Sequence, residues 1–289
     1  QSLLESFWST CLELGRLPAL DELEDPKSLE VAIGSPRKAL QVLEATADVG
    51  DLELARAFRT EDLLVYFALG LFGERKPYTH MAEGMKRDIK AFFGTYQNAI
   101  ESAKEALFSV SNVQLINNLC EKAATELPAC QLNTNHSLIF HERYLNQLPP
   151  ELRIYVGCAA QLVGELEDID LVKIHITSGK VSFMIYEEFD SSPLPKLVER
   201  IKVRMRDQDV DFFDYVEPYR PPLLYWKSRY IDESFQDYKK QLSFDKRIAE
   251  TGIVTPDREF GPMRSELDLQ LRELGLEIRG YRFYKVNGE

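Results

Sequence analysis

Cysteine is scarce in this sequence, and its few copies stand far apart. Only four cysteines occur in 289 residues, at positions 11, 120, 130 and 158, and no two of them form a C-x-x-C pair. Zinc sites and disulfide frameworks need closely spaced cysteines or a high cysteine content. We therefore expect buried, reduced thiols of an intracellular protein, and we assign no cysteine-based metal site.

Long hydrophobic runs are also missing. The longest, residues 63–72, has about half the length that a membrane-spanning helix needs, and no signal peptide is visible. These absences argue against a membrane partner and predict a soluble, cytoplasmic protein. Residue 1 is Gln, and an apolar helical stripe already begins at Leu3. We therefore expect the chain to start inside a longer polypeptide.

Positive charge is in deficit. The 35 Lys and Arg residues face 47 Asp and Glu residues, for a net charge of −12 and a pI near 5.0. Such a balance argues against a protein that binds nucleic acid over its whole surface. The deficit is uneven, because residues 1–50 are predominantly acidic whereas acids and bases balance over residues 201–250. The composition is thus compatible with an acidic body that carries one basic face.

Histidine is rare too, with four copies in the chain. His136 and His141 lie five positions apart, which is not the four-residue spacing of a helical zinc motif. No Ser-His-Asp set can be proposed, because sequence order alone would fit almost any protein. We assign no catalytic residue and no metal ligand.

What the chain does contain is typical of a folded protein of mixed class. It is 44% hydrophobic and 11% aromatic, with no low-complexity tract. Residues 1–165 show successive helical stripes with caps such as Ser35-Pro36 and Pro149-Pro150. We predict an α+β fold: a helical region over 1–165, and an α+β region over 166–289 with a small, mostly antiparallel sheet flanked by helices.

The pattern changes from helix to strand at residue 171. Residues 171–176 and 180–186 alternate on either side of a turn that contains Gly179, which predicts a hairpin. Ser192-Pro193 predicts the start of a short helix. Residues 200–206 read Arg-Ile-Lys-Val-Arg-Met-Arg, followed by a partner strand over 210–215. Residues 276–285 also alternate and can add an edge to the sheet.

The alternation over 200–206 places all four cations of this segment on one side of the strand. Long cations in a row suit a phosphate backbone, because each contact releases condensed counterions. Aromatic residues nearby (Tyr186, Tyr215, Tyr225 and Trp226) can stack on exposed bases. The candidate nucleic-acid-binding residues are Lys173, His175, Lys180, Arg200, Lys202, Arg204, Arg206 and Lys227.

Two other interpretations of these residues stay open. The cations can pair with the aspartates of the neighbouring strand, Asp207, Asp209, Asp211 and Asp214, which makes the face a solvated structural surface. Alternatively, Asp170, Lys173 and His175, with Glu165 and Glu167 upstream, resemble a metal-dependent nuclease cluster. No second acid at suitable spacing is evident for that cluster.

Several segments resemble those of one known family in the same order along the chain. They read GSPRKA (34–39), RTEDLLVY (59–66), AFFGTY (91–96), PELRIYVGCA (150–159), DLVKIH (170–175) and VDFFDY (210–215). Together they are similar to the DNA phosphorothioation-associated methyltransferase family, whose members accompany systems that replace a backbone phosphate oxygen of DNA with sulfur. The likeness runs from about residue 3 to about residue 286.

The chain departs from that family where a methyl donor would bind. It contains no G-x-G turn and no Asp/Asn-Pro-Pro-aromatic tetrapeptide; the nearest stretches are Leu148-Pro149-Pro150-Glu151 and Arg220-Pro221-Pro222-Leu223. The chain therefore resembles the region downstream of the methyltransferase domain. The resemblance implies S-adenosylmethionine only for an upstream domain, and we expect no cofactor in this chain.

These observations predict a DNA-binding and positioning module of a phosphorothioation-linked modification or defence system. Its expected partners are DNA, including phosphorothioate-modified DNA, and other components of that system. An acidic protein-interaction scaffold in the same system and a metal-dependent nuclease are the alternatives.

Overall fold

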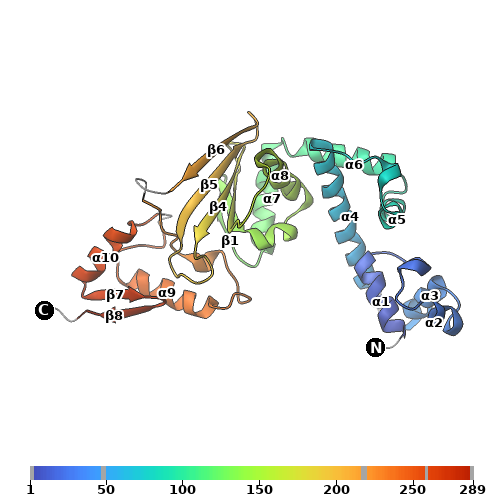
Figure 1. Ribbon diagram of the computed structural model, residues 1–289, viewed down its shortest axis with the longest axis horizontal. Coiled ribbons are helices and arrows are strands. Elements are labelled where there is room, and N and C mark those ends of the chain that lie inside the picture. Colours follow the sequence, from blue (N-terminus) through green and yellow to red (C-terminus); the bar gives the residue numbers. More distant parts are fainter. Residues whose placement is uncertain (1–2, 47–49, 216–219, 258–259, 287–289) are drawn as a thin grey trace. The chain divides into compact units, whose positions relative to one another are not determined.

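The computed structural model describes residues 3–46, 50–215, 220–257 and 260–286. The chain divides into two compact units, Gln1–Ser109 and Val110–Glu289. The described part of the first unit is built from helices, whereas the second combines helices with a six-stranded antiparallel sheet and a two-stranded sheet (Figure 1). The predicted α+β fold class is confirmed.

The first unit consists of α-helices linked by short 3-10 turns. Its elements are α1 (Leu3–Leu14), η1 (Leu20–Glu22), α2 (Pro26–Ala32), α3 (Pro36–Thr46), α4 (Gly50–Phe72), η2 (Tyr78–His80), α5 (Glu83–Phe92) and α6 (Tyr96–Ser109). The predicted start of α3 is confirmed, because Pro36 opens that helix and the Ser35 hydroxyl accepts the Lys38 amide at 3.3 Å. Helix α4 runs without a break through Thr60, whose hydroxyl donates to the carbonyl of Arg56 one turn earlier.

A buried ion network ties the loop after α1 to α5. The guanidinium of Arg16 donates to Asp88 at 2.6 Å and to Glu22 at 2.7 Å. Arg16 and Asp88 are both buried, so each charge depends on the other for its solvation. The hydrogen bond from the Arg16 guanidinium lowers the pKa of Glu22 to about 2.

The second unit carries the sheet and its flanking helices. Its elements are α7 (Val113–Glu126), β1 (Cys130–Asn133), β2 (Ser137–His141), η3 (Glu142–Gln147), α8 (Pro150–Val163), β3 (Leu171–His175), β4 (Lys180–Glu187), β5 (Lys196–Arg204), β6 (Asp209–Asp214), η4 (Lys227–Arg229), α9 (Tyr238–Glu250), α10 (Arg264–Glu273), β7 (Leu276–Arg279) and β8 (Arg282–Lys285). This unit begins well before the boundary expected at residue 165, because α7, β1, β2 and α8 belong to the sheet's own core.

The six strands stand side by side in chain order, β1-β2-β3-β4-β5-β6, and every pair is antiparallel. The predicted hairpin is confirmed as β3 and β4, with Gly179 at φ +62° in its turn. A positive φ is nearly free of cost only for glycine, which explains that residue's place in the turn. The predicted pairing of the cationic strand with the next strand is confirmed as β5 and β6.

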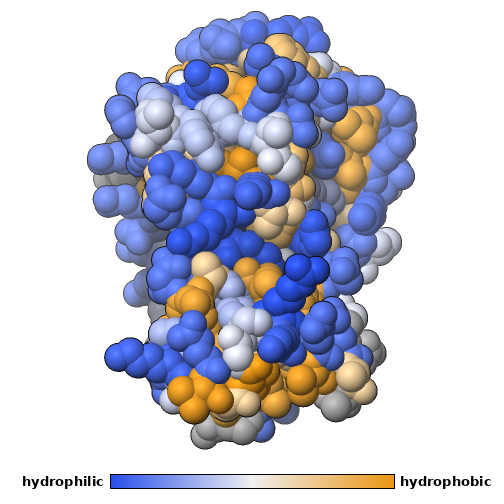
Figure 2. Space-filling model, turned by 90° about the vertical axis from the view of Figure 1, so that its right-hand side faces the viewer, coloured by the Kyte–Doolittle hydropathy of each residue, from blue (hydrophilic) through white to orange (hydrophobic). Residues whose placement is uncertain are grey.

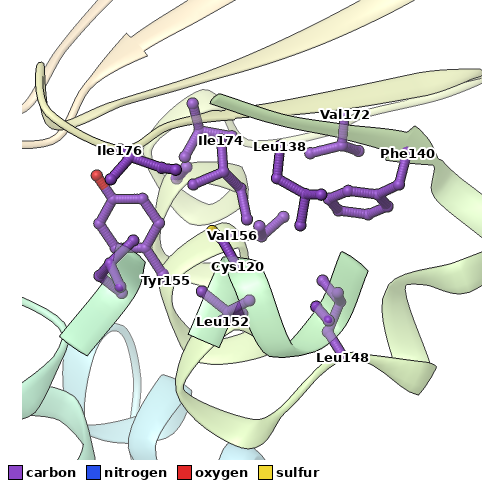
Figure 3. Packing of buried hydrophobic residues seen from close by; sticks show 14 of the residues in the cluster. Cys120, Leu138, Phe140, Leu148, Leu152, Tyr155, Val156, Val172, Ile174 and Ile176 are labelled. Carbon is purple, nitrogen blue, oxygen red and sulfur yellow. The ribbon is translucent and has the colours of Figure 1, made fainter. Parts of the chain in front are cut away.

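Helices α7 and α8 cover one face of the sheet. Figure 3 shows Leu138, Val172 and Ile174 pointing from the strands toward Leu152 and Val156 of α8. These five side chains are almost fully buried, and each such burial stabilises the fold by about 1.5–3 kcal/mol. This packing fixes which residues of β3, β4 and β5 point to the opposite face.

Part of that opposite face is covered by residues 222–231, which we call the C-terminal segment. Leu171 and Met184 of the sheet cluster with Leu224, Tyr230 and Ile231. Backbone hydrogen bonds attach the segment: the Leu197 amide donates to the Pro222 carbonyl, and the Leu224 amide donates to the Pro195 carbonyl, both at 2.8 Å. The rest of the face, around Lys173, Ser182 and Lys202, is lined by polar and charged side chains.

Two local predictions in the second unit are wrong. The helix expected from Ser192-Pro193 does not form; the chain turns there and enters β5 at Lys196, because its backbone pairs with residues 222–224. Residues 276–285 add no edge to the main sheet. They form the separate two-stranded sheet β7-β8, whose Ile278 and Phe283 pack against a C-terminal cluster around Phe244.

All four cysteines are free, and Cys11, Cys120 and Cys158 are buried. Burial raises the pKa of these three thiols to about 12, so they pack as small apolar groups. Within the described parts of the chain, no helix combines the length and the apolarity that crossing a bilayer requires.

Candidate nucleic-acid interface

The face of the sheet turned away from α7 and α8 gathers cations from three neighbouring strands. Val172 and Ile174 of β3, like Ile201 and Val203 of β5, point into the helix-covered core. Because side chains alternate along a strand, Lys173, Lys180, Arg200 and Lys202 point the other way. We call these four residues the basic cluster.

The strand register explains why the cluster is compact. Lys173 lies opposite Ser182 of β4, and Ser182 in turn lies opposite Lys202 of β5. Ser182 is short and fully buried, so two long cationic side chains flank a small residue. Neighbouring strands stand about 4.8 Å apart, so the backbones of Lys173 and Lys202, with β4 between them, are roughly 10 Å apart. Lys173 is buried, with 5% of its surface exposed, and it contributes positive potential from beneath the surface.

Electrostatic crowding in the cluster is visible in two pKa values. Burial lowers the pKa of Lys202, and the positive charges of Arg200, Lys180 and Lys173 lower it further. Burial also lowers the pKa of His175 to about 3, with Lys173 and Arg200 next in effect. His175 is therefore neutral at pH 7, and its Nε2 lies 3.0 Å from the Ser182 hydroxyl.

One carboxylate, that of Asp211 on β6, lies opposite Lys202 and partly offsets the neighbouring positive charges. Within the described residues, no ion pair joins Lys180, Arg200 or Lys202 to an acid; Lys202 instead lies over the ring of Phe213, 5.0 Å from its centroid. The Nε atom of Arg200 is buried and has no hydrogen-bond partner. A buried donor without an acceptor is costly, so this arrangement favours an anionic or acceptor ligand.

Arg204 belongs to a different environment from its neighbours on β5. Its guanidinium pairs with Asp209 of β6, and also with Asp211 at 3.2 Å and Asp207 at 3.8 Å. For this one predicted residue, the interpretation as a cation paired with acids of the next strand is confirmed. Arg204 lies at the end of β5 beside the basic cluster, and the three aspartates neutralise its charge.

The structure places two further predicted residues away from the cluster. Arg206 lies in the turn after β5 and lines a groove with Tyr155 and Ile176, on the side that the helices cover. Lys227 is buried, and its ammonium donates to the carbonyls of Phe189 and Ser192 at 2.7 Å each. Lys227 therefore anchors the C-terminal segment to the loop before β5 and does not face the cluster.

A pocket adjoins the basic cluster at its lower end. Lys173 and Arg200 line it together with aromatic side chains, of which the sequence had indicated Tyr186, Tyr215, Tyr225 and Trp226. Sequence reasoning missed Gln131, Arg229 and Tyr230, which also line it. No local sequence pattern indicates these three residues, because β1 and the C-terminal segment come together only in the folded chain. There the Tyr230 hydroxyl donates to Gln131 at 2.7 Å.

The residues of the nuclease alternative are not brought together. Asp170 is half-buried and accepts the Tyr186 amide at 2.7 Å, and burial raises its pKa to about 6. Among the residues that the structure describes, no three His, Cys, Asp or Glu side chains group as metal ligands. The nuclease interpretation stays a prediction without a geometric observation in its favour.

No protein-family model, no curated protein and no solved structure matches this chain. The resemblance to the phosphorothioation-associated family therefore stays a prediction. The functional interpretation depends on the basic cluster and the pocket beside it.

Proposed function

We propose that the basic cluster binds the phosphate backbone of DNA, and that the chain acts as a DNA-binding and positioning module. The observation that carries this proposal is the gathering of Lys173, Lys180, Arg200 and Lys202 on one face across three strands, while Asp209 and Asp211 of β6 form their ion pairs with Arg204. Phosphate contacts by such cations release counterions and drive sequence-independent binding.

The acidity of the rest of the chain supports DNA binding at the basic cluster. A net charge of −12 repels a polyanion from most of the surface, and a local positive site then determines where DNA docks. From the resemblance stated above we infer that the module serves a phosphorothioation-linked modification or defence system in the cytoplasm, with other components of that system as partners. Any S-adenosylmethionine would belong to an upstream methyltransferase domain.

Charge reversal tests the proposal. The double substitution Arg200→Glu with Lys202→Glu should abolish salt-sensitive binding of a labelled DNA in a fluorescence anisotropy titration at low salt. The matched control is Lys239→Glu with Lys246→Glu on the exposed side of α9, which makes the same change in net charge. Equal loss in both variants, or no loss in the first, would show that the cluster is not the site.

A protein-interaction role is the second candidate, and the surface of the first unit favours it. Val31 is 90% exposed, and Leu54, Phe58 and Phe108 are also exposed. Figure 2 shows hydrophobic residues gathered among hydrophilic ones at its lower end, the height at which α1 to α3 stand in Figure 1. Contiguous exposed apolar patches are typical of partner-binding surfaces, whereas single exposed apolar residues are ordinary. A filter-binding assay without any salt-sensitive DNA signal would favour this role over DNA binding.

A further inference from the structure

The pocket beside the basic cluster has an apolar interior with aromatic walls. Leu171 and Met184 form its floor on the sheet, and Tyr186, Tyr215, Trp226 and Tyr230 are among the side chains around it. These residues come from β3, β4, the end of β6 and the C-terminal segment, which hydrogen bonds to β5 hold in place. The pocket is therefore built by the fold and does not depend on one loop.

Its size sets a limit on what can enter. The space open to the centres of water molecules is about 80 Å³. One water needs roughly 10–15 Å³ of such space, so the pocket has room for a handful of waters or for a single planar ring. A stacked base pair is too large for it.

Cations line the pocket from two elements. Lys173 and Arg200 come from the sheet, with Lys202 following them across Ser182, and Arg229 comes from the C-terminal segment. The buried Nε of Arg200 still lacks an acceptor. The complementary ligand has a flat ring with an anionic group attached a short distance away, which is the chemistry of a nucleotide.

We propose that this pocket takes one unpaired base of single-stranded DNA, while the phosphate next to that base lies on Arg200 and Lys202. The inference rests on the proposed DNA binding and narrows its ligand from DNA in general to an unpaired nucleotide. Bases in a duplex have both faces stacked and their edges paired, so a pocket for one ring is reached only by an unpaired or extruded base. Aromatic side chains hold such bases by stacking, whatever the base.

Two labelled strands of the same length and charge separate ring binding from phosphate binding. One is oligothymidylate, and the other is an abasic strand that keeps every phosphate but has no bases. The full chain should bind oligothymidylate about tenfold more tightly than the abasic strand, since stacking of one base on aromatic side chains gives this order of preference. Equal affinity for the two strands would overturn the pocket.

Variants assign the preference to the pocket. Tyr215→Ala, and separately Tyr186→Ala, should remove the preference for oligothymidylate and leave the affinity for the abasic strand unchanged. Tyr215→Phe keeps the ring and should keep the preference. Thermal melting of each variant confirms folding, and the comparison of the two strands with the unaltered chain needs no variant at all.

The outcomes also separate this inference from the function on which it rests. Binding of both strands with equal, salt-sensitive affinity keeps the DNA-binding proposal and overturns the pocket. No binding of either strand overturns both. Binding of thymidine monophosphate that Tyr215→Ala abolishes, without binding of any strand, would show a site for a free nucleotide and would still overturn both proposals about DNA.

Discussion

Lys202 and Arg204 lie two residues apart on the same side of β5, yet only one of them has free charge. Three aspartates surround the guanidinium of Arg204, whereas Lys202 lies among three cations with Asp211 opposite it and, in the described part of the chain, makes no ion pair. Lys202→Gln should therefore lower the slope of log affinity for DNA against log salt by about one, since one phosphate contact is lost. Fluorescence anisotropy at several salt concentrations measures this slope.

Arg204→Gln is the matched variant for that measurement, because it removes one charge from the same strand. Its slope should stay that of the unaltered chain. A larger effect of Arg204→Gln than of Lys202→Gln would show that the aspartates do not neutralise Arg204 in solution.

His175 should make the stability of the sheet depend on pH. Its pKa is about 3 in the folded chain, against a usual value of 6.5. Between these two values the unfolded chain binds the proton and the folded chain does not, so the free energy of unfolding falls as the pH falls from 6.5 toward 3. Urea unfolding at several pH values should show a smaller fall for His175→Gln, whose amide can still reach Ser182.

The exposed His80 provides the comparison for that experiment. His80→Gln should leave the fall between pH 6.5 and 3 unchanged. If the pH dependence of His175→Gln runs parallel to that of the unaltered chain, then His175 is protonated in the folded protein as readily as in the unfolded one.

At the scale of elements, α8 is the helix on which the position of the basic cluster depends. Leu152 is fully buried between α8 and the sheet (Figure 3). Leu152→Ala should lower the free energy of unfolding by about 2–5 kcal/mol, through lost burial and the cavity that remains. Circular dichroism during urea unfolding measures the change.

Leu269→Ala on α10 is the control, because Leu269 is 61% exposed. Its effect should stay within about 0.5 kcal/mol. A similar cost at both positions would mean that α8 does not pack on the sheet as described.

The sequence predicted elements well where local signals suffice. The alternation around Gly179 predicted the β3-β4 hairpin, and Pro150 predicted the start of α8. It failed at Ser192-Pro193, where a local helix signal loses to backbone pairing with residues 222–224. Local propensity is a weak prior that tertiary contacts override.

The candidate site was only partly predictable for the same reason. Alternation on β5 correctly placed Arg200 and Lys202 on one face. The meeting of Lys202 with Lys173 depends on the order of strands β3, β4 and β5. The capture of Arg204 by Asp209 depends on the register of β6. Neither order nor register can be derived from the residues of one strand alone.

At the scale of the whole molecule, each unit has a core of its own. Phe7, Cys11 and Leu29 centre the core of the first unit, whereas the second has the cluster between the sheet and its helices. A fragment of residues 110–289 should therefore fold alone and bind DNA with the affinity of the full chain. Circular dichroism and fluorescence anisotropy of this fragment check both statements.

The corresponding fragment of residues 1–109 should fold without binding DNA. If DNA binding needs both fragments together, the basic cluster is not a sufficient site, and the first unit supplies part of the interface.

The order of the six strands also bears on how the protein is made. Each strand of the main sheet pairs with its predecessor in the chain, so no strand waits for a partner that has yet to be synthesised. Contacts between segments close in sequence cost little loop entropy and speed folding. The sheet can thus assemble progressively during translation, and refolding from denaturant should be rapid for a β-containing unit of this size.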